Sequence, residues 1–271
     1  MLIERILVTL VLLPFGLAAI WFGGIVFTVV VALIIGLAAW EYSHLFRLSG
    51  HQPAEAIVIG GAAALVLGRW YAGFETASWI LTLLIFAAMT YHLVRYESGR
   101  NQAATDMAIT ISGALYFGWL GAYLVSLRNL PDGVWWFLLM LPTVWFVDTG
   151  AFFIGRTFGR RKLSPRLSPK KTWEGYWGGV ATGVLGGALL ALFIRQLSGV
   201  PAITALHGAV LGLALGLLTP LGDLGESMIK RQSGAKDASN LLPGHGGVFD
   251  RIDSWLWAAA IGYYIIVWLY L

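Results

Sequence analysis

The residues best suited to chemistry lie late in the chain, in the segment KDASNLLPGHGGVFDRID from Lys236 to Asp253. Asp250 and Asp253 stand three residues apart, so they would share one face at the start of a helix. Capping of that helix explains one of the two carboxylates. It does not explain the glycines around His245, among them Gly246 and Gly247, which let backbone N–H groups approach an oxyanion. The segment therefore predicts a site that handles anionic groups.

A second charged group precedes this segment, in TPLGDLGESMIKRQ. Helical spacing places four of its polar residues on one face: Asp223, Glu226, Ser227 and Lys230. Asp223 and Asp250 would bring carboxylates from different helices together, and hard oxygen ligands of this kind suit Mg²⁺, which also binds substrate phosphates. Four cations would neutralise further phosphate charge: Lys230, Arg231, Lys236 and Arg251. The pattern predicts metal-assisted phosphoryl or nucleotidyl transfer, with Asp223 and Asp250 as metal ligands.

A basic stretch, GRTFGRRKLSPRLSPKKTWEG at residues 155–175, follows Asp148. Its end combines hydroxyls and lysines with a helix N-terminus, which predicts a cradle for phosphate oxygens built from Ser168, Lys170, Lys171 and Thr172. Attraction to an anionic membrane surface is the alternative interpretation of the same charges. Asp148 lies inside an apolar stretch, where an ionisable group is costly and indicates function. A structural pairing of Asp148 with a loop arginine is its competing interpretation.

The composition places most of the chain in lipid. Of its 271 residues 58% are hydrophobic and only 12% are charged, about half the charged share of a soluble domain. The absence of cysteine excludes disulfides and thiolate chemistry. About nine apolar stretches are long enough to span a bilayer, and we expect the first to be retained rather than cleaved as a signal. These stretches are residues 6–22, 24–42, 54–71, 77–94, 107–127, 133–154, 175–195, 203–222 and 254–271. The sequence predicts an all-α polytopic membrane protein.

The charged gaps between these stretches predict the topology. With nine spans, fifteen of the eighteen lysines and arginines fall on one side, and only Arg69, Arg128 and Arg195 on the other. This bias places the N-terminus and the charged gaps in the cytoplasm. Basic residues placed this way favour membrane topology over nucleic-acid binding. We expect one integral unit, with N-terminal helices in 1–130 and a catalytic region in 131–271, in a bacterial inner membrane.

Glycines recur at helical spacing in two of the apolar stretches, at residues 178–187 and 208–216. No basic residue and only one hydroxyl residue, Thr182, accompany them, so a phosphate-binding loop is the weaker interpretation. Small residues in this pattern favour close packing of neighbouring helices.

The segment SMIKRQSGAKDASNLLPGHGGVFDRID, Ser227 to Asp253, resembles the signature of phosphatidate cytidylyltransferases, also called CDP-diacylglycerol synthases. The serine, Lys-Arg, the four-residue gap, Lys-Asp, His-Gly-Gly and Asp-Arg-hydrophobic-Asp are all present. The stretch DTGAFFIGRTFGRRKLSPRLSPKKTWEG, residues 148–175, is similar to the other characteristic stretch of that family. The first third of the chain matches only in hydrophobic character.

The resemblance implies a Mg²⁺-dependent reaction in which phosphatidate attacks the α-phosphorus of CTP and pyrophosphate leaves. It also implies a homodimer with a polar cavity open to the cytosol. In that cavity the resemblance places two cations, Mg²⁺ and a second one, held by Asp223 and Asp250. The catalytic residues we predict are Lys230, Lys236, Asp237, His245, Arg251 and Asp253. Asp237 and Asp253 would orient the lysines or the metal's surroundings rather than accept a proton. The substrate-binding residues we predict are Asp148, Ser168, Lys170, Lys171, Thr172, Ser227, Arg231, Gly246 and Gly247.

Two other functions stay open on the sequence. A CTP-dependent polyprenol or lipid kinase would release CDP, and the complete His-Gly-Gly and Asp-Arg pattern argues against it. A transporter would use Asp148 and Asp223 as ion sites within the membrane, but its charge would be divided between two related halves. The sequence leaves open the acyl-chain preference, the choice between CTP and dCTP, and which loop lysines contact CTP or lipid.

Overall fold

The structure, a computed structural model, describes residues 2–244 and 246–270. Its helices form two compact units. The first contains the residues up to Ser126 together with Ile229–Ile252, and the second contains Leu127–Met228 together with the residues from Asp253 onward. The sequence pattern predicts a C-terminal catalytic region at 131–271, whereas in the structure Ile229–Ile252 belongs to the first unit, with the N-terminal helices.

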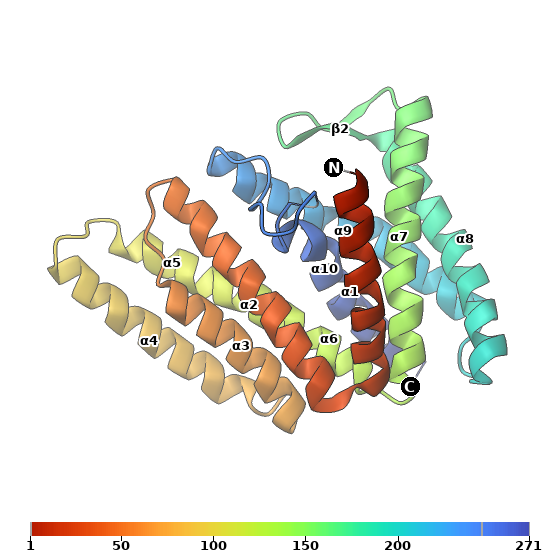
Figure 1. Cartoon of the computed structure of the whole chain (residues 1–271), viewed down its shortest axis with the longest axis horizontal. Coiled ribbons are helices and arrows are strands. Elements are labelled where there is room, and N and C mark those ends of the chain that lie inside the picture. Colours follow the sequence, from red (N-terminus) through yellow and green to blue (C-terminus); the bar gives the residue numbers. More distant parts are fainter. Residues whose placement is uncertain (1, 245, 271) are drawn as a thin grey trace. The chain divides into compact units, whose positions relative to one another are not determined.

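The first unit is built from long apolar helices around a buried core. In chain order they are α1 (Leu2–Phe22), α2 (Gly24–Leu48), α3 (Glu55–Ala72), α4 (Ala77–Glu97), α5 (Ala103–Ala114), the π-helical turn η1 (Leu115–Trp119) and α6 (Leu120–Arg128). In Figure 1, α2, α3 and α4 lie side by side, and α3 also packs against α5 and η1. Ile35, Val58 and Phe117 are fully buried in this core.

The second unit depends on close contacts between glycines. Its elements are α7 (Gly133–Phe158), the strands β1 (Lys162–Ser164) and β2 (Ser168–Thr172), α8 (Trp173–Ser198), and most of α9 (Ala205–Gln232) and α10 (Phe249–Leu269). A methyl group on Gly183, Gly208 or Gly212 would collide with a backbone carbonyl of the facing helix. The predicted packing role of these glycines is therefore confirmed, because only glycine allows the α8 and α9 backbones to approach so closely.

Eight helical segments in the described residues are long and apolar enough to cross a membrane. They are Gly24–Leu48, Glu55–Ala72, Ala77–Glu97, Ala103–Arg128, Gly133–Phe158, Trp173–Ser198, Ala205–Gln232 and Phe249–Leu269. The first predicted span falls in α1, whose stretch Leu12–Phe22 is apolar but shorter. Helices satisfy their own backbone hydrogen bonds, as lipid requires. The chain is thus an all-α integral membrane protein; the cytoplasmic N-terminus and the polar cavity remain predictions.

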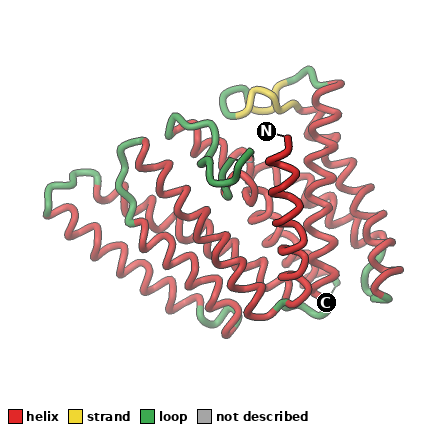
Figure 2. The backbone as a smooth tube through the Cα atoms, viewed as in Figure 1, coloured by secondary structure: helices red, strands yellow, loops and turns green. Residues whose placement is uncertain are grey.

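The strands of the described residues form one antiparallel hairpin between α7 and α8 (Figure 2). In its register Lys162 lies opposite Thr172, and Ser164 lies opposite Ser168. Glu174, in the first turn of α8, accepts hydrogen bonds from two backbone N–H groups just before β1, those of Arg160 at 3.0 Å and Arg161 at 3.2 Å. The hairpin is therefore tied to the helix that follows it.

A buried aspartate anchors two of the interhelical loops of the first unit. Asp106 is fully buried and accepts hydrogen bonds from Arg100 Nε at 2.7 Å and from the backbone N–H of Gln52 at 2.9 Å. His51 Nδ1 lies 3.5 Å from the same carboxylate. The hydrogen bond to Asp106 raises the pKa of the Arg100 guanidinium. These contacts join the α2–α3 loop to the α4–α5 loop.

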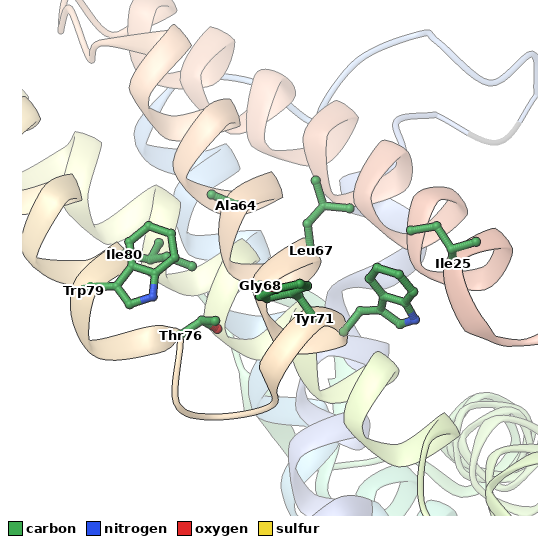
Figure 3. A pocket seen from close by; sticks show the side chains of 9 residues that line it. Ile25, Ala64, Leu67, Gly68, Tyr71, Thr76, Trp79 and Ile80 are labelled. Carbon is green, nitrogen blue, oxygen red and sulfur yellow. The ribbon is translucent and has the colours of Figure 1, made fainter.

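An apolar cavity of about 450 Å³ opens between α2, α3 and α4 (Figure 3). Aromatic and aliphatic side chains form most of its lining, with Thr76 as a polar member. The lining residues are Ile25, Ala64, Leu67, Gly68, Trp70, Tyr71, Thr76, Trp79 and Ile80. The lining contains no charged side chain, so this cavity is not suited to the chemistry of phosphate groups.

Candidate active site

Three carboxylates of the second unit meet where α9 and α10 come together. At Gly222 the two backbones are so close that a Cβ would lie 2.6 Å from the carbonyl oxygen of Asp253. This approach brings Asp223, the next residue of α9, beside Asp253, and Glu226 follows one helical turn later. Ligand oxygens of Asp223, Glu226 and Asp253 all lie within 4.8 Å of one another. Glu226 and Asp253 are buried, at 3% and 9% exposure, and Asp223 is half-buried.

The donor set of this acidic cluster fits a hard divalent cation, which prefers carboxylate oxygens. Asp223 also forms an ion pair with Lys171, the penultimate residue of β2. Ser227 Oγ donates to Asp223 Oδ1 at 3.4 Å, a long hydrogen bond. The cluster can therefore bind a cation with its carboxylates and present an ammonium group at the same place.

Asp148, on α7, lies close enough to the acidic cluster to interact with its charges. Its side chain is exposed, and the charges of Asp223 and Lys171 act on both Asp148 and Asp253. Lys171 of the predicted phosphate-binding loop therefore lies beside the predicted metal ligand Asp223. Whether Asp148 contacts substrate stays a prediction.

Two members of the acidic cluster differ from the metal ligands predicted from the sequence. The sequence pattern predicts that Asp253 orients other groups, and in the structure its carboxylate lies in the cluster. The pattern places Glu226 on the same helix face as Asp223 but does not predict it as a ligand. The signal that identifies it is the three-residue spacing from Asp223, which puts both carboxylates on consecutive turns.

The predicted phosphate cradle around β2 is only partly available for binding. Lys170 is exposed and Ser168 is half-buried, so both can meet a ligand. Thr172 is buried, and its hydroxyl accepts a hydrogen bond from the backbone N–H of Gly175 at 3.1 Å. Thr172 is therefore the N-cap of α8, and its contact with substrate remains a prediction.

Asp250 has its own set of partners in the first unit. Its Oδ1 accepts from Lys230 Nζ at 2.6 Å, and its Oδ2 accepts from the backbone N–H groups of Ala238 at 2.9 Å and Gly247 at 2.8 Å. The Asp250 side chain is 7% exposed. Because Asp223 belongs to the other unit, the predicted sharing of a cation between Asp223 and Asp250 stays a prediction.

Carboxylate groups occupy the space beside the glycine-rich turn before α10. Gly246 has φ of 80°, a conformation that favours glycine, and a Cβ there would lie 2.9 Å from Asp250 Oδ2. The N–H of Gly247 donates to Asp250, as described above. An oxyanion of substrate would share or replace that acceptor, so the predicted phosphate contacts of both glycines remain predictions. His245 lies outside the described residues.

The remaining predicted residues lie at the surface of the first unit. Lys236 and Asp237 are exposed in the loop between α9 and α10. Arg231 is exposed at the end of α9 and donates to the carbonyl of Ala235 at 3.1 Å. Arg251 is exposed in the first turn of α10. Exposed cations of this kind are placed where an anionic substrate can reach them.

Sequence reasoning missed Glu41, on α2, which is fully buried. Its carboxylate accepts from the backbone N–H groups of Val248 at 2.9 Å and Phe249 at 2.6 Å, and from Ser239 Oγ at 2.5 Å. About 200 residues separate Glu41 from these partners in the chain. Its only sequence signal is an acidic residue within an apolar stretch.

Comparison with known proteins agrees with this chemistry. Residues 3–269 match the model of the Cytidylyltransferase family. A phosphatidate cytidylyltransferase of Pseudomonas aeruginosa is 37% identical over 279 residues, covering 99% of this chain and 97% of the relative. One of Synechocystis sp. is 31% identical over 295 residues, with 98% and 97% covered. One of Brucella suis is 36% identical over 263 residues, with 96% and 91% covered. The chain therefore belongs to the cytidylyltransferase family.

Proposed function

We propose that this chain is a phosphatidate cytidylyltransferase that converts CTP and phosphatidate to CDP-diacylglycerol and pyrophosphate. The full-length similarity to proteins of that name supports the proposal. The structural observation that carries it is the acidic cluster of Asp223, Glu226 and Asp253 with Lys171 in contact. Carboxylates for a cation and an ammonium group for phosphate are the parts that nucleotidyl transfer requires.

In the proposed reaction, an oxygen of the phosphatidate phosphate forms a bond to the α-phosphorus of CTP. The bond from that phosphorus to the oxygen bridging to the β-phosphorus breaks, and pyrophosphate leaves with the electron pair. The attacking phosphate is already an anion, so no strong general base is needed. Catalysis then consists of positioning and of stabilising charge on the triphosphate. Lys171, which forms an ion pair with Asp223, supplies positive charge beside the acidic cluster, and Lys170 remains a proposed phosphate-binding residue.

Mg²⁺ is the cofactor we propose, together with a second cation at the same centre. Asp223, Glu226 and Asp253 would hold Mg²⁺, because their oxygens form a hard donor set of the right kind. When bound, the ion would neutralise phosphate oxygens and polarise the reacting phosphorus. Asp250 remains a proposed ligand from the sequence pattern, and Ser227 supports the orientation of Asp223.

The proposed setting is a bacterial inner membrane with the site facing the cytoplasm. The positive-inside distribution of lysine and arginine supports this orientation, and CTP is a cytoplasmic solute. The lipid substrate carries two acyl chains, which explains why the enzyme spans the bilayer. We also propose that the enzyme is a homodimer.

The products distinguish this proposal from its alternatives. Purified protein in lipid nanodiscs would be incubated with CTP, phosphatidate and Mg²⁺, and both pyrophosphate and CDP would be quantified. We expect one pyrophosphate for each CDP-diacylglycerol, and loss of both with Asp253→Asn. Release of CDP with a new phosphorylated lipid would instead identify a kinase. If neither pyrophosphate nor CDP forms, and the protein carries solute into liposomes, the chain is a transporter.

A further inference from the structure

We propose that Glu41 is a positioning residue for cytidylyl transfer, because its carboxylate fixes the segment that carries Lys236, Asp237 and Asp250. The catalytic part of this inference rests on the proposed function, whereas the anchoring is a property of the structure itself. Glu41 lies in the first third of the chain, where the family resemblance is only general. This part of the chain would therefore have a defined role at the site.

Both oxygens of the Glu41 carboxylate accept hydrogen bonds from the loop between α9 and α10 or from the first residue of α10. Oε1 accepts from the Val248 N–H and from Ser239 Oγ, and Oε2 accepts from the Phe249 N–H. Ser239 lies near the start of the loop and Val248 at its end. One carboxylate therefore connects residue 239, near the start of the loop, with residue 248 at its end.

A buried charge in an apolar helix is costly unless hydrogen bonds compensate for it. Here the compensation comes from the N-terminus of α10, where backbone N–H groups have no partner within their own helix. A negative charge at this end is also favoured by the helix dipole. Hydrogen bonds from N–H groups to a carboxylate are about twice as strong as those between neutral groups. Glu41 and α10 therefore stabilise each other.

Two further contacts hold the same point of the chain. A Cβ on Gly247 would lie 2.7 Å from both carboxylate oxygens of Glu41, so a larger residue at this position would displace the carboxylate. On the other side, the Phe249 ring packs against Phe117 of η1 with centroids 4.8 Å apart. Tyr116, also in η1, lies 6.2 Å from the Phe249 ring. The start of α10 is thus held by α2 and by a π-helical turn, a feature often found at functional sites.

This anchoring acts directly on the neighbouring ion pair. Asp250 is the residue after Phe249, and its Oδ2 accepts from Gly247, the residue before Val248, whose N–H donates to Glu41. Any displacement of residues 247–249 therefore moves the Asp250 carboxylate and the Lys230 ammonium bound to it. Because a misplacement of about 1 Å can cost about a hundredfold in rate, a residue that never contacts substrate can control turnover.

The test compares Glu41→Gln and Glu41→Ala with the unchanged protein and with Glu97→Gln. Glu97 is the exposed last residue of α4, so it provides the same chemical change away from the loop. Glutamine can keep the acceptor for Val248 but presents an N–H group to Phe249, while alanine removes every bond. We expect kcat to fall about tenfold for glutamine and about a hundredfold for alanine, with KM for CTP changed less than twofold.

Hydrogen–deuterium exchange provides a readout that does not depend on activity. We expect faster exchange at residues 238–252 in both Glu41 variants, with unchanged exchange in α3, α4 and α7, and wild-type behaviour for Glu97→Gln. Wild-type kcat in Glu41→Ala would overturn the positioning role, and unchanged exchange at residues 238–252 would overturn the anchoring. If the unchanged protein makes no CDP-diacylglycerol, the proposed function fails, but the exchange experiment still decides whether Glu41 anchors the loop.

Discussion

Lys230 Nζ lies 2.6 Å from Asp250 Oδ1, and the two side chains are only 11% and 7% exposed. One end of this pair is on α9 and the other is in the first turn of α10, so it joins the two helices that border the signature loop. Burial makes each charge depend on the other, because removing one partner leaves the other in a poorly solvated place. Substitution of either residue of this pair should therefore lower the rate of catalysis.

Asp250→Asn should lower the rate of CDP-diacylglycerol formation about a hundredfold, since the charged contact with Lys230 is weakened and the loop loses its orientation. Lys230→Met should have a similar effect. The double variant should be less damaging than the two single effects combined, with a coupling of about 1–3 kcal/mol in the rate analysis. Fully additive effects would show that the two residues act independently.

Divalent-cation binding should depend on the acidic cluster. Glu226→Gln and Asp253→Asn should each weaken Mn²⁺ binding, followed by electron paramagnetic resonance of the purified protein, at least about tenfold. Asp132→Asn is the matched control, because Asp132 is an exposed aspartate at the start of α7. Equal Mn²⁺ affinity in the control and in both cluster variants would place the cation elsewhere.

Lys171 and a divalent cation compete for the Asp223 carboxylate. Lys171→Met should therefore tighten Mn²⁺ binding without nucleotide about two- to fivefold, a modest effect because both side chains are partly exposed. The same variant should lower CTP turnover, because an ammonium group near phosphate is lost. Lys162→Met, an exposed lysine of the same hairpin, serves as the control. Weaker Mn²⁺ binding in Lys171→Met would contradict the competition.

Gly247→Ala should reproduce the effect of Glu41→Gln, since the added methyl group collides with the Glu41 carboxylate. The backbone of Gly247 does not have positive φ, so the collision rather than backbone strain is being tested. Gly60→Ala, in α3, meets no atom within 4 Å and should leave turnover unchanged. Parallel measurements of kcat and of exchange at residues 238–252 would check this. Normal turnover in Gly247→Ala would mean that the loop tolerates displacement.

The parts of the fold that lipid dictates could be predicted from the sequence. Backbone groups within a bilayer must be satisfied inside the helix, so long apolar runs map onto α2–α10 with little ambiguity. Glycines at helical spacing, such as Gly183 and Gly212, likewise predict close packing. The hairpin β1–β2 could not be predicted, because strands of three and five residues rich in lysine, serine and proline carry no alternating pattern.

Part of the acidic cluster follows from helical spacing, because two of its residues are close in the chain. Asp223 and Glu226 share a face by spacing alone, and Asp253 lies in the recognisable signature. Glu41 could not be found in the same way, because its partners Val248 and Phe249 lie about 200 residues away and no local pattern encodes the contact. The grouping of Ile229–Ile252 with the N-terminal helices is likewise a property of tertiary packing.

In the proposed reaction, the α-phosphorus of CTP, with its cytidine, is transferred to phosphatidate. Isotope labelling tests this transfer: the protein in nanodiscs containing phosphatidate is incubated with CTP labelled in either the α- or the γ-phosphate, and the lipid is then extracted. We expect label in the lipid only from α-labelled CTP, with the γ-label recovered as pyrophosphate. Label in the lipid from γ-labelled CTP would contradict it and identify the chain as a lipid kinase.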